Sequence, residues 1–429
     1  MRTNVIAGEV LESAHLHRAP TSNQRNAAPG VDGVTWEQYA GNLEDNLLEL
    51  HARLHSGAYR AKPSRKCTFR RQTGGQRPLG IASLEEKIVQ RAVVEVLNAI
   101  YEADFLGFSY GFRPRRSQHH ALDALAVGIR RCKVSWFLDS DIHGYFDAID
   151  HGWMVRFLEH RIADKRMLRL LRKWLSAGVI EGEEWTRGEE GTPQGATVSP
   201  LLANIHLHYV LDLWVQQWRS RYARGSVIIT RFANDFVVGF QYRTDAERFL
   251  QNLRERLRKF ALELHPDKTR ILEFGRHAAS NLQEKGQGKP ESFNFLGFTH
   301  ICGKTWMGKF LIVRRTMRER MRKKLHEVKA ELQRRRHHLI PEQGKRLRSV
   351  VQEHFLYYAV PSNGRSLQWF RTQVTRHWHR ALRRRSQRDR TTCARMQRLA
   401  QRWIPLVRIL HPWPDERFRV KTRGKSPVR

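Results

Sequence analysis

The chain has 429 residues, which is too long for one ordinary hydrophobic core and predicts two or three domains, and its 40% apolar residues exclude wholesale disorder. Its 77 Lys and Arg against 42 Asp and Glu give a formal net charge of +35, which favours nucleic acid as the partner over a basic surface that is merely well solvated. It contains no run of about 18 apolar residues, and its four cysteines lie at no metal-ligand spacing, so the sequence predicts no membrane span, zinc module or disulfide framework.

The first hundred residues predict helices and a hairpin that follow a divergent segment. Residues 1–26 are polar and lack strong periodicity, and the turn-rich residues 27–33 begin the ordered part. Leucine spacing predicts a helix over 35–55, and two short strands around a Gly-Gly turn predict a β-hairpin over 65–82. A capping-box pattern then opens a helix over 83–101.

Two short acidic islands follow, each beside an apolar run with the character of a strand. The first, residues 141–147, reads Asp-Ile-His-Gly-Tyr-Phe-Asp, and the second, residues 231–236, reads Arg-Phe-Ala-Asn-Asp-Phe near the tip of a hairpin over 227–240. In a polymerase palm, carboxylates from two neighbouring strands hold two divalent cations about 3.5–4 Å apart. The islands therefore predict a palm in which Asp141 and Asp235 lie on adjacent strands.

The second half of the chain predicts a helix over 245–262, short strands over 293–298 and 310–313, and then a change of character. After Arg314, Met and Leu recur every three or four residues, which predicts an amphipathic helix whose other faces carry Arg and Lys. A coiled-coil seam with a solvated charged face is one interpretation. We favour a helical bundle that packs its own core and presents a basic face to RNA.

Taken in order, several short motifs resemble those of bacterial group II intron-encoded reverse transcriptases and maturases. Eight segments carry the resemblance: Gln76–Ile81, Ser109–Pro114, Asp141–Asp147, Gly191–Pro200, Phe232–Asp235, Leu264–Thr269, Phe295–Phe298 and Tyr357–Pro361. Each alone is modest evidence, but eight in the family's order at sensible spacing form a specific signature that covers about residues 27–425.

The resemblance implies an α+β fold of the right-hand polymerase type. It divides the chain into a divergent N-terminal segment (1–26), reverse transcriptase fingers and a palm with an antiparallel sheet (27–313), an α-helical thumb or maturase domain (314–395) and a basic C-terminal tail (396–429). The first segment does not resemble the family's usual helical extension, so it is either divergent or cut short. No cluster of Cys pairs and His follows the thumb, so the zinc-associated endonuclease of some relatives is not predicted.

The resemblance also implies the catalytic residues and the cofactor. Asp141 is expected to bind both Mg²⁺ ions, for which Mn²⁺ is a substitute. A carboxylate that only caps the next helix is the alternative, and the motif context makes it the weaker interpretation. Asp235 is the second expected metal ligand. Asn234 takes the place of the family's essential first Asp of that pair, and its amide oxygen carries no charge to neutralise the cations. Lys268 resembles the residue proposed to protonate the pyrophosphate; a solvated surface Lys fits equally well.

A second implied set binds the incoming nucleotide. Arg77 is expected to pair with the triphosphate, and Arg71 keeps the charge of a Lys that the family usually has there. Phe146 matches the aromatic residue that excludes a 2′-hydroxyl, and it is also a plausible core residue. Gln194 is expected to line the pocket unless it only bonds its own loop, and Gly195 permits close approach of the backbone.

The expected function is that of an RNA-directed DNA polymerase that also binds its intron RNA and assists splicing in the bacterial cytoplasm. Its partners are group II intron RNA, an RNA template with a DNA primer, and dNTPs, with no membrane involved. Two alternatives stay open: an RNA-binding maturase that has lost polymerisation, which Asn234 favours, and a reverse transcriptase of a defence system. The residues expected to contact RNA are Arg315, Arg322, Lys323, Arg383, Arg384 and Arg385.

Overall fold

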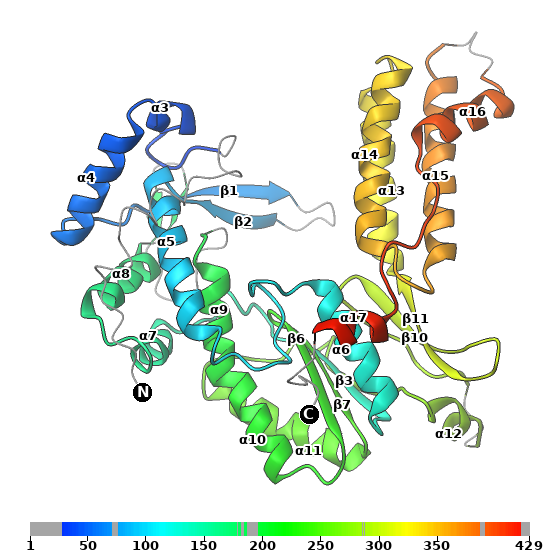
Figure 1. The fold of residues 1–429 in the computed structure, drawn as a ribbon, viewed down its shortest axis with the longest axis horizontal. Helices are drawn as coiled ribbons and strands as arrows, with labels where there is room; N and C mark the ends of the chain where they lie inside the picture. The colour runs from blue at the N-terminus through cyan, green and yellow to red at the C-terminus, as the bar shows by residue number, and fades with distance from the viewer. Residues whose placement is uncertain are drawn as a thin grey trace.

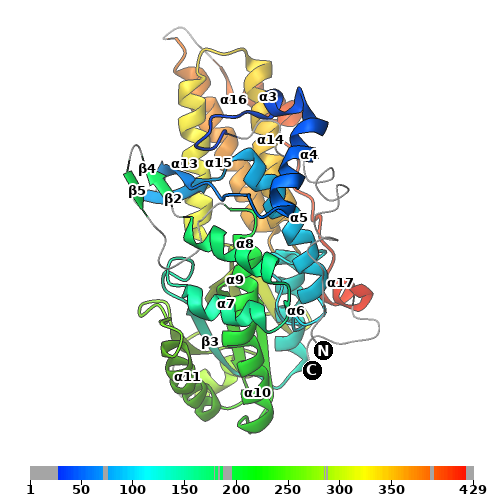
Figure 2. The same cartoon turned by 90° about the vertical axis from the view of Figure 1, so that its left-hand side faces the viewer.

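The structure, a computed structural model, describes residues 28–70, 76–177, 179–181, 184–186, 196–284, 286, 288–386 and 391–421. Its elements form three groups, and Figure 1 shows the N-terminal group in blue and the C-terminal helices in yellow and orange on opposite sides of a central sheet. Turned by 90°, the molecule presents the N-terminal group to the viewer (Figure 2).

The N-terminal group, or fingers, consists of short helices and a small sheet. It comprises α3 (Trp36–Ala40), α4 (Leu43–His55), β1 (Ser64–Arg70), β2 (Gln76–Ile81) and α5 (Leu84–Tyr101), and β4 (Val179–Glu181) and β5 (Glu184–Thr186) join it later in the chain. The strand order is β2-β1-β4-β5, and β1 and β2 pair antiparallel, as the hairpin prediction requires. The Ser83 hydroxyl accepts a hydrogen bond from the Glu86 amide and starts α5, which confirms that predicted helix start.

The central group, or palm, is an antiparallel sheet with helices on both faces. Its strands are β3 (Trp136–Asp141), β6 (Val227–Phe232), β7 (Asp235–Phe240) and β8 (Arg270–Glu273), in the order β6-β7-β3-β8. Its helices are α6 (Gln118–Arg131), α7 (His151–Glu159), α8 (Lys165–Ser176), α9 (Ser199–Leu207), the π-helix η1 (His208–Asp212), α10 (Leu213–Arg221) and α11 (Arg243–Arg258).

Alternation along the palm strands explains why the sheet is covered on both faces. Leu138 and Val238 pack with residues of α9, α10 and α11 in one buried cluster. Their strand neighbours Phe137 and Val237 point to the other face and pack with α6 in a second cluster. Neither face is left to solvent, and the strand ends become the places where polar side chains gather.

The C-terminal group, or thumb, begins beyond a three-stranded sheet and packs its own core. The sheet consists of β9 (Phe293–Phe295), β10 (Phe298–Lys304) and β11 (Phe310–Thr316), and α12 (Ala278–Glu284) precedes it. The thumb helices are α13 (Arg318–Arg334), α14 (Ile340–Tyr358), α15 (Gly364–Arg383) and α16 (Cys393–Trp403). Their apolar faces form a separate buried cluster, which confirms the predicted bundle.

The last described helix, α17 (Pro414–Lys421), returns from the thumb to the palm and lies beside α6 (Figure 1). One buried carboxylate joins the parts: Asp123 of α6 accepts Arg314 Nη1 of β11 at 3.0 Å and lies 2.8 Å from Arg417 Nε of α17. The α+β architecture with an antiparallel sheet and a helical C-terminal region is as predicted. In the part of the chain that the structure describes, the helices are too short or too polar to cross a bilayer.

Candidate active site

The two acidic islands meet at one end of the palm sheet. Strands β3 and β7 pair antiparallel, and Asp141 is the direct cross-strand partner of Asp235. The β6–β7 hairpin pairs Phe232 with Asp235, so Ala233 and Asn234 form its two-residue turn, in which Ala233 adopts a φ of +56°. The prediction that the two carboxylates lie on adjacent strands is therefore confirmed.

Both oxygens of Asp141 are occupied by donors from other segments. The Asn234 side-chain amide donates to Oδ1 at 3.1 Å, and Lys268 Nζ donates to Oδ2 at 2.8 Å. The loop that carries Lys268 is held in place by its backbone, because the His265 amide donates to the Asp141 carbonyl at 2.8 Å. The structure thus brings together three of the residues predicted to be catalytic: Asp141, Asn234 and Lys268.

Electrostatics at this end of the sheet favour a cation. The Asp235 side chain is exposed at the end of the sheet, but protein around it still reduces its hydration. This desolvation, together with the charge of Asp141, raises the pKa of Asp235 to about 6. The opposing influences are cations, Arg320 at the start of α13 and Lys268. A divalent cation that binds between the two carboxylates would offset the repulsion that raises the pKa of Asp235.

Asp139 is a third carboxylate at this end of the sheet, and our sequence analysis did not identify it. It lies two residues before Asp141 on β3 and so projects from the same face. Desolvation raises its pKa to about 6, with further contributions from Asp235 and Asp141, while Arg270 at 3.9 Å opposes the shift. The Asp-x-Asp spacing within a predicted strand was the available signal.

A fully buried ion pair supports the β6–β7 turn that carries Asn234. Arg231 donates through Nε and Nη2 to the two carboxylate oxygens of Asp212 at 2.7 and 2.5 Å, and neither side chain is exposed to solvent. Its Nη1 donates to the carbonyl of Ala233 at 3.0 Å and to Asn204 Oδ1 at 3.1 Å. Asp212 ends the π-helix η1, an irregularity that places its side chain under the turn. Arg231 therefore positions the turn that carries Asn234.

The segment Ser109–Pro114, one of the eight that carry the family resemblance, packs against the same turn. Ser109 forms a bridge with Arg231, and the Ser109 hydroxyl accepts from Arg231 Nη2 at 2.6 Å. At Gly111 an added Cβ would lie only 2.3 Å from the Ala233 amide nitrogen, so no larger residue fits there. The Gly111 carbonyl accepts a hydrogen bond from Asn204 at 2.5 Å.

The residues predicted to bind nucleotide are only partly described. Phe146 is half-buried, contacts the Tyr145 ring edge-on at 5.4 Å and packs against the palm core, so the sugar-gate and core interpretations both stay open. Arg77 lies in β2 opposite Phe69. Arg71, Gln194 and Gly195 lie outside the described residues.

The thumb attaches beside the candidate site through the predicted motif at Phe295–Phe298. Leu296 and Gly297 form a tight turn with φ of +46° and +81°, and the Leu296 carbonyl accepts from the Tyr357 hydroxyl at 2.8 Å. The Gly297 carbonyl accepts from the Met317 amide at 3.0 Å, one residue before α13 begins. The thumb is therefore fixed to the palm at its base, close to Arg320, a cation that our sequence analysis did not identify.

The predicted RNA-binding residues are displayed on the thumb and the strand that leads to it. Arg315 lies on β11, Arg322 and Lys323 lie on α13, and all three are exposed. Arg383 and Arg384 are exposed at the end of α15. Arg385 is half-buried and donates to the carbonyl of His338. Whether these cations contact RNA stays a prediction.

The residues present fit a divalent metal ion. Because Asn234 is an amide, they carry one negative charge less than a set with a carboxylate at that position. Asp141 and Asp235 offer carboxylate oxygens, and Asn234 offers an amide oxygen, which are donors that Mg²⁺ accepts. Among the described residues no three His, Cys, Asp or Glu side chains are gathered as a ready cluster. A carboxylate at position 234 would supply the charge that this amide lacks.

Comparison with known proteins assigns the fold and site to a family. The family model described as "Reverse transcriptase (RNA-dependent DNA polymerase)" matches residues 61–300, more than half of the chain. This chain therefore belongs to the reverse transcriptase family. The matched region contains the palm sheet and Asp141, Asn234, Asp235 and Lys268.

Individual relatives place the chain near the intron-encoded branch of that family. It is 34% identical over 291 residues to "Protein YkfC" of Escherichia coli K12, covering 60% of this chain and 76% of that protein. It is 36% identical over 202 residues, 47% of this chain, to the "Group II intron-encoded protein LtrA" of Lactococcus lactis, of which the match covers only 33%. The predicted resemblance to group II intron-encoded reverse transcriptases is confirmed.

Two further matches are an intron protein and a solved structure. A protein described as an "Uncharacterized 91 kDa protein in cob intron" of Schizosaccharomyces pombe is 36% identical over 47% of this chain and 25% of its own length. An apo telomerase structure from Candida tropicalis gives a TM-score of 0.42 at 12% identity, covering 56% of this chain and 53% of that one. This chain thus spans three quarters of YkfC but a third or less of the two intron proteins.

Proposed function

We propose that this chain is an RNA-directed DNA polymerase and RNA-binding maturase of a group II intron, acting in the bacterial cytoplasm. The observation that carries the proposal is the cross-strand pairing of Asp141 with Asp235 at the sheet end where Lys268 also lies. Membership of the reverse transcriptase family gives that geometry its chemical meaning. The substrates are an RNA template, a DNA primer and dNTPs.

Asp141 and Asp235 would hold the two Mg²⁺ ions, which when bound acidify the primer hydroxyl and neutralise charge on the leaving pyrophosphate. The remaining roles belong to the protein. Lys268 holds a proton at Nζ beside the carboxylate and is placed to give it to the leaving group. Arg231 keeps the turn with Asn234 at a fixed distance from β3 through the Ala233 carbonyl.

Asn234 reduces this activity and supports a second candidate function. Its amide hydrogen-bonds Asp141 where the family has a charged metal ligand, so the site lacks one negative charge. A maturase that binds RNA through its basic thumb and no longer polymerises is the function that this observation favours as the alternative.

Primer extension tests the proposal directly. The variant Asn234→Asp is mixed with a DNA-primed RNA template, dNTPs and Mg²⁺, and cDNA is measured, with Asp141→Ala in the same background as the inactive control. We expect cDNA from the variant and none from the control. If Asn234→Asp makes no cDNA although it binds the primed template, the polymerase assignment fails and the non-catalytic maturase is the better account.

A further inference from the structure

A cavity of about 280 Å³ opens where the fingers meet the palm helix α8. Figure 1 shows these elements on the side of the molecule away from the thumb helices. The cavity lies between the end of α4, the middle of α5 and one face of α8. None of its lining residues belongs to the candidate active site, and none was singled out by the sequence motifs. Its chemistry therefore calls for a separate explanation.

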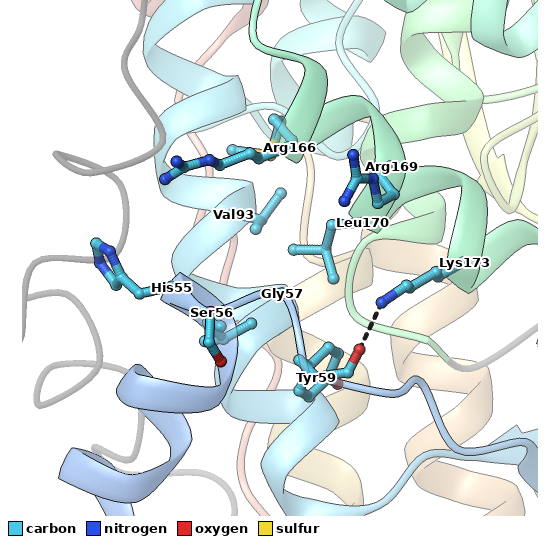
Figure 3. A pocket seen from close by; sticks show the side chains of 11 residues that line it. His55, Ser56, Gly57, Tyr59, Val93, Arg166, Arg169, Leu170 and Lys173 are labelled. Atoms are coloured by element: carbon cyan, nitrogen blue, oxygen red, sulfur yellow. Dashed lines mark hydrogen bonds between the residues drawn. The ribbon is translucent and has the colours of Figure 1, made fainter.

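Three cations line one wall of this cavity because of helix geometry. Arg166, Arg169 and Lys173 occupy positions three and four residues apart on α8, so they share a face of the helix (Figure 3). Lys173 Nζ donates to the Tyr59 carbonyl at 2.6 Å. Among the described residues, neither exposed guanidinium has an ion pair with a carboxylate, and no Asp or Glu lines the cavity.

The floor of the cavity is apolar. The Leu170 side chain points into it from α8 and is partly exposed, while Val93 of α5 lies buried beneath (Figure 3). The buried Tyr59 ring closes one end. A bare inorganic anion would contact the cations but not the apolar floor of the cavity. A ligand that uses both carries a negative charge next to a flat, weakly polar ring, which is the chemistry of a nucleotide.

We propose that this cavity binds one unpaired nucleotide of an RNA strand, with the phosphate at Arg166 and Arg169 and the base over Leu170. The proposal deepens the proposed function, and rests on it only in taking RNA as the polymer that this protein binds. Unpaired RNA bases are free to leave the stack and to lie against apolar or guanidinium surfaces, whereas bases in a duplex are not. The site holds RNA at a distance from the reacting atoms and so acts in binding, not in chemistry.

Fluorescence anisotropy of the full chain tests the proposal, with a labelled oligouridylate as the probe and an abasic oligonucleotide of the same length for comparison. Leu170→Ala removes most of the apolar surface proposed to lie under the nucleobase and keeps every charge. We expect it to weaken oligouridylate binding about fivefold or more while leaving abasic binding unchanged, since a stacked base contributes on that scale. Arg166→Ala with Arg169→Ala should weaken both probes and lower the slope of log affinity against log salt by about 0.7, the value for one neutralised phosphate of a single strand.

Arg172→Ala is the matched control, because Arg172 is on the same helix, does not line the cavity and pairs with Glu159. Oligouridylate binding that is unchanged in both cavity variants would overturn the proposal, as would a loss of the same size in the control. Because Arg166 and Arg169 are exposed, their double variant keeps the test valid even if Leu170→Ala lowers the melting temperature. Primer extension by the same preparations reports on the polymerase separately, so either proposal can fail while the other holds.

Discussion

At the scale of single residues, the exchange of a carboxylate for the amide of Asn234 changes the charge of the candidate site and the bonding of Asp141. The amide donates to one oxygen of Asp141, and the ammonium of Lys268 takes the other. A cation that enters must compete with both donors. Desolvation is the main cause of the raised pKa of both Asp235 and Asp139. The charge of Asp141 adds to it at Asp235, and at Asp139 the charges of Asp235 and Asp141 add to it against the opposing charge of Arg270.

The pH dependence of metal binding follows from the raised pKa of Asp235. Because this pKa is about 6 and not near 4, the carboxylate is lost to protonation as the pH falls through about 6. A proton then has to leave before the cation binds, so the apparent affinity for Mn²⁺ should fall about tenfold for each pH unit below 6. Mn²⁺ titrations between pH 5 and pH 8 measure this. An affinity that stays flat down to pH 5 contradicts the assignment of Asp235 as a ligand.

The buried pair of Arg231 and Asp212 gives a stability prediction. Asp212→Ala leaves the guanidinium in the core without its partner, so we expect a loss of about 3–5 kcal/mol in the free energy of unfolding. Urea denaturation followed by tryptophan fluorescence measures it. Arg172→Ala, which breaks an exposed pair with Glu159, is the control and should cost about 0.5 kcal/mol or less. Equal effects of the two substitutions would refute the role given to the buried pair.

At the scale of elements, the candidate site is a junction of segments far apart in the sequence. The β6–β7 turn is held from below by the Ser109–Pro114 segment and by η1, and the loop that carries Lys268 pairs with the end of β3. The site geometry therefore depends on backbone positions that carry no chemistry themselves.

Gly111 is the clearest of these positions. An alanine there would place its Cβ 2.3 Å from the backbone of Ala233, so the turn that carries Asn234 has to shift. In the Asn234→Asp background, Gly111→Ala should reduce cDNA synthesis by at least about tenfold, since displacements near 1 Å cost this much or more. Gly288→Ala, a glycine with open space around it, is the control and should leave synthesis unchanged. Full activity in the Gly111 variant would show that the contact is not needed.

The basic end of α15 gives a prediction about RNA binding. Replacing Arg383, Arg384 and Arg385 with Ala should weaken binding of intron-derived RNA and reduce its salt dependence, because each phosphate contact releases counterions. Filter binding at several salt concentrations measures both. Replacing Arg243, Arg254 and Arg258 on α11 removes the same charge from the palm and serves as the control. If the salt dependence is unchanged at α15, or falls equally in the control, this cluster is a solvated surface.

At the scale of the whole molecule, the palm and the thumb are joined by a few buried polar contacts. Asp123 takes Arg314 from the strand before the thumb and Arg417 from the helix after it. The Tyr357 hydroxyl fixes the other side of the thumb base to the palm. The chain enters and leaves the thumb at anchored points, which holds the basic helices in a defined place beside the candidate site.

Local patterns in the sequence were sufficient to predict much of this molecule. The cap at Ser83, the hairpin around Asn234 and the apolar spacing of α13 are each set by neighbours within a few residues, and all appear as expected. The role expected of Lys268 came only from the family resemblance, and its contact with Asp141 was not predicted. Local sequence patterns do not predict which distant segments meet in the fold. The buried Arg231–Asp212 pair and the contact of α17 with Asp123 depend on such meetings, so they could not be predicted.

The rate of cDNA synthesis by the unmodified chain, relative to its Asn234→Asp variant, tests the central claim most directly. Both proteins are given the same primed RNA template, dNTPs and Mg²⁺, and single-nucleotide addition is timed under single-turnover conditions. The loss of one charged ligand should raise the barrier by several kcal/mol, so we predict that the variant is about 10³-fold faster or more, and that Asp141→Ala abolishes its activity while RNA binding persists. Equal, robust Mg²⁺-dependent rates for the two proteins would contradict this account and show that Asn234 already completes the metal site.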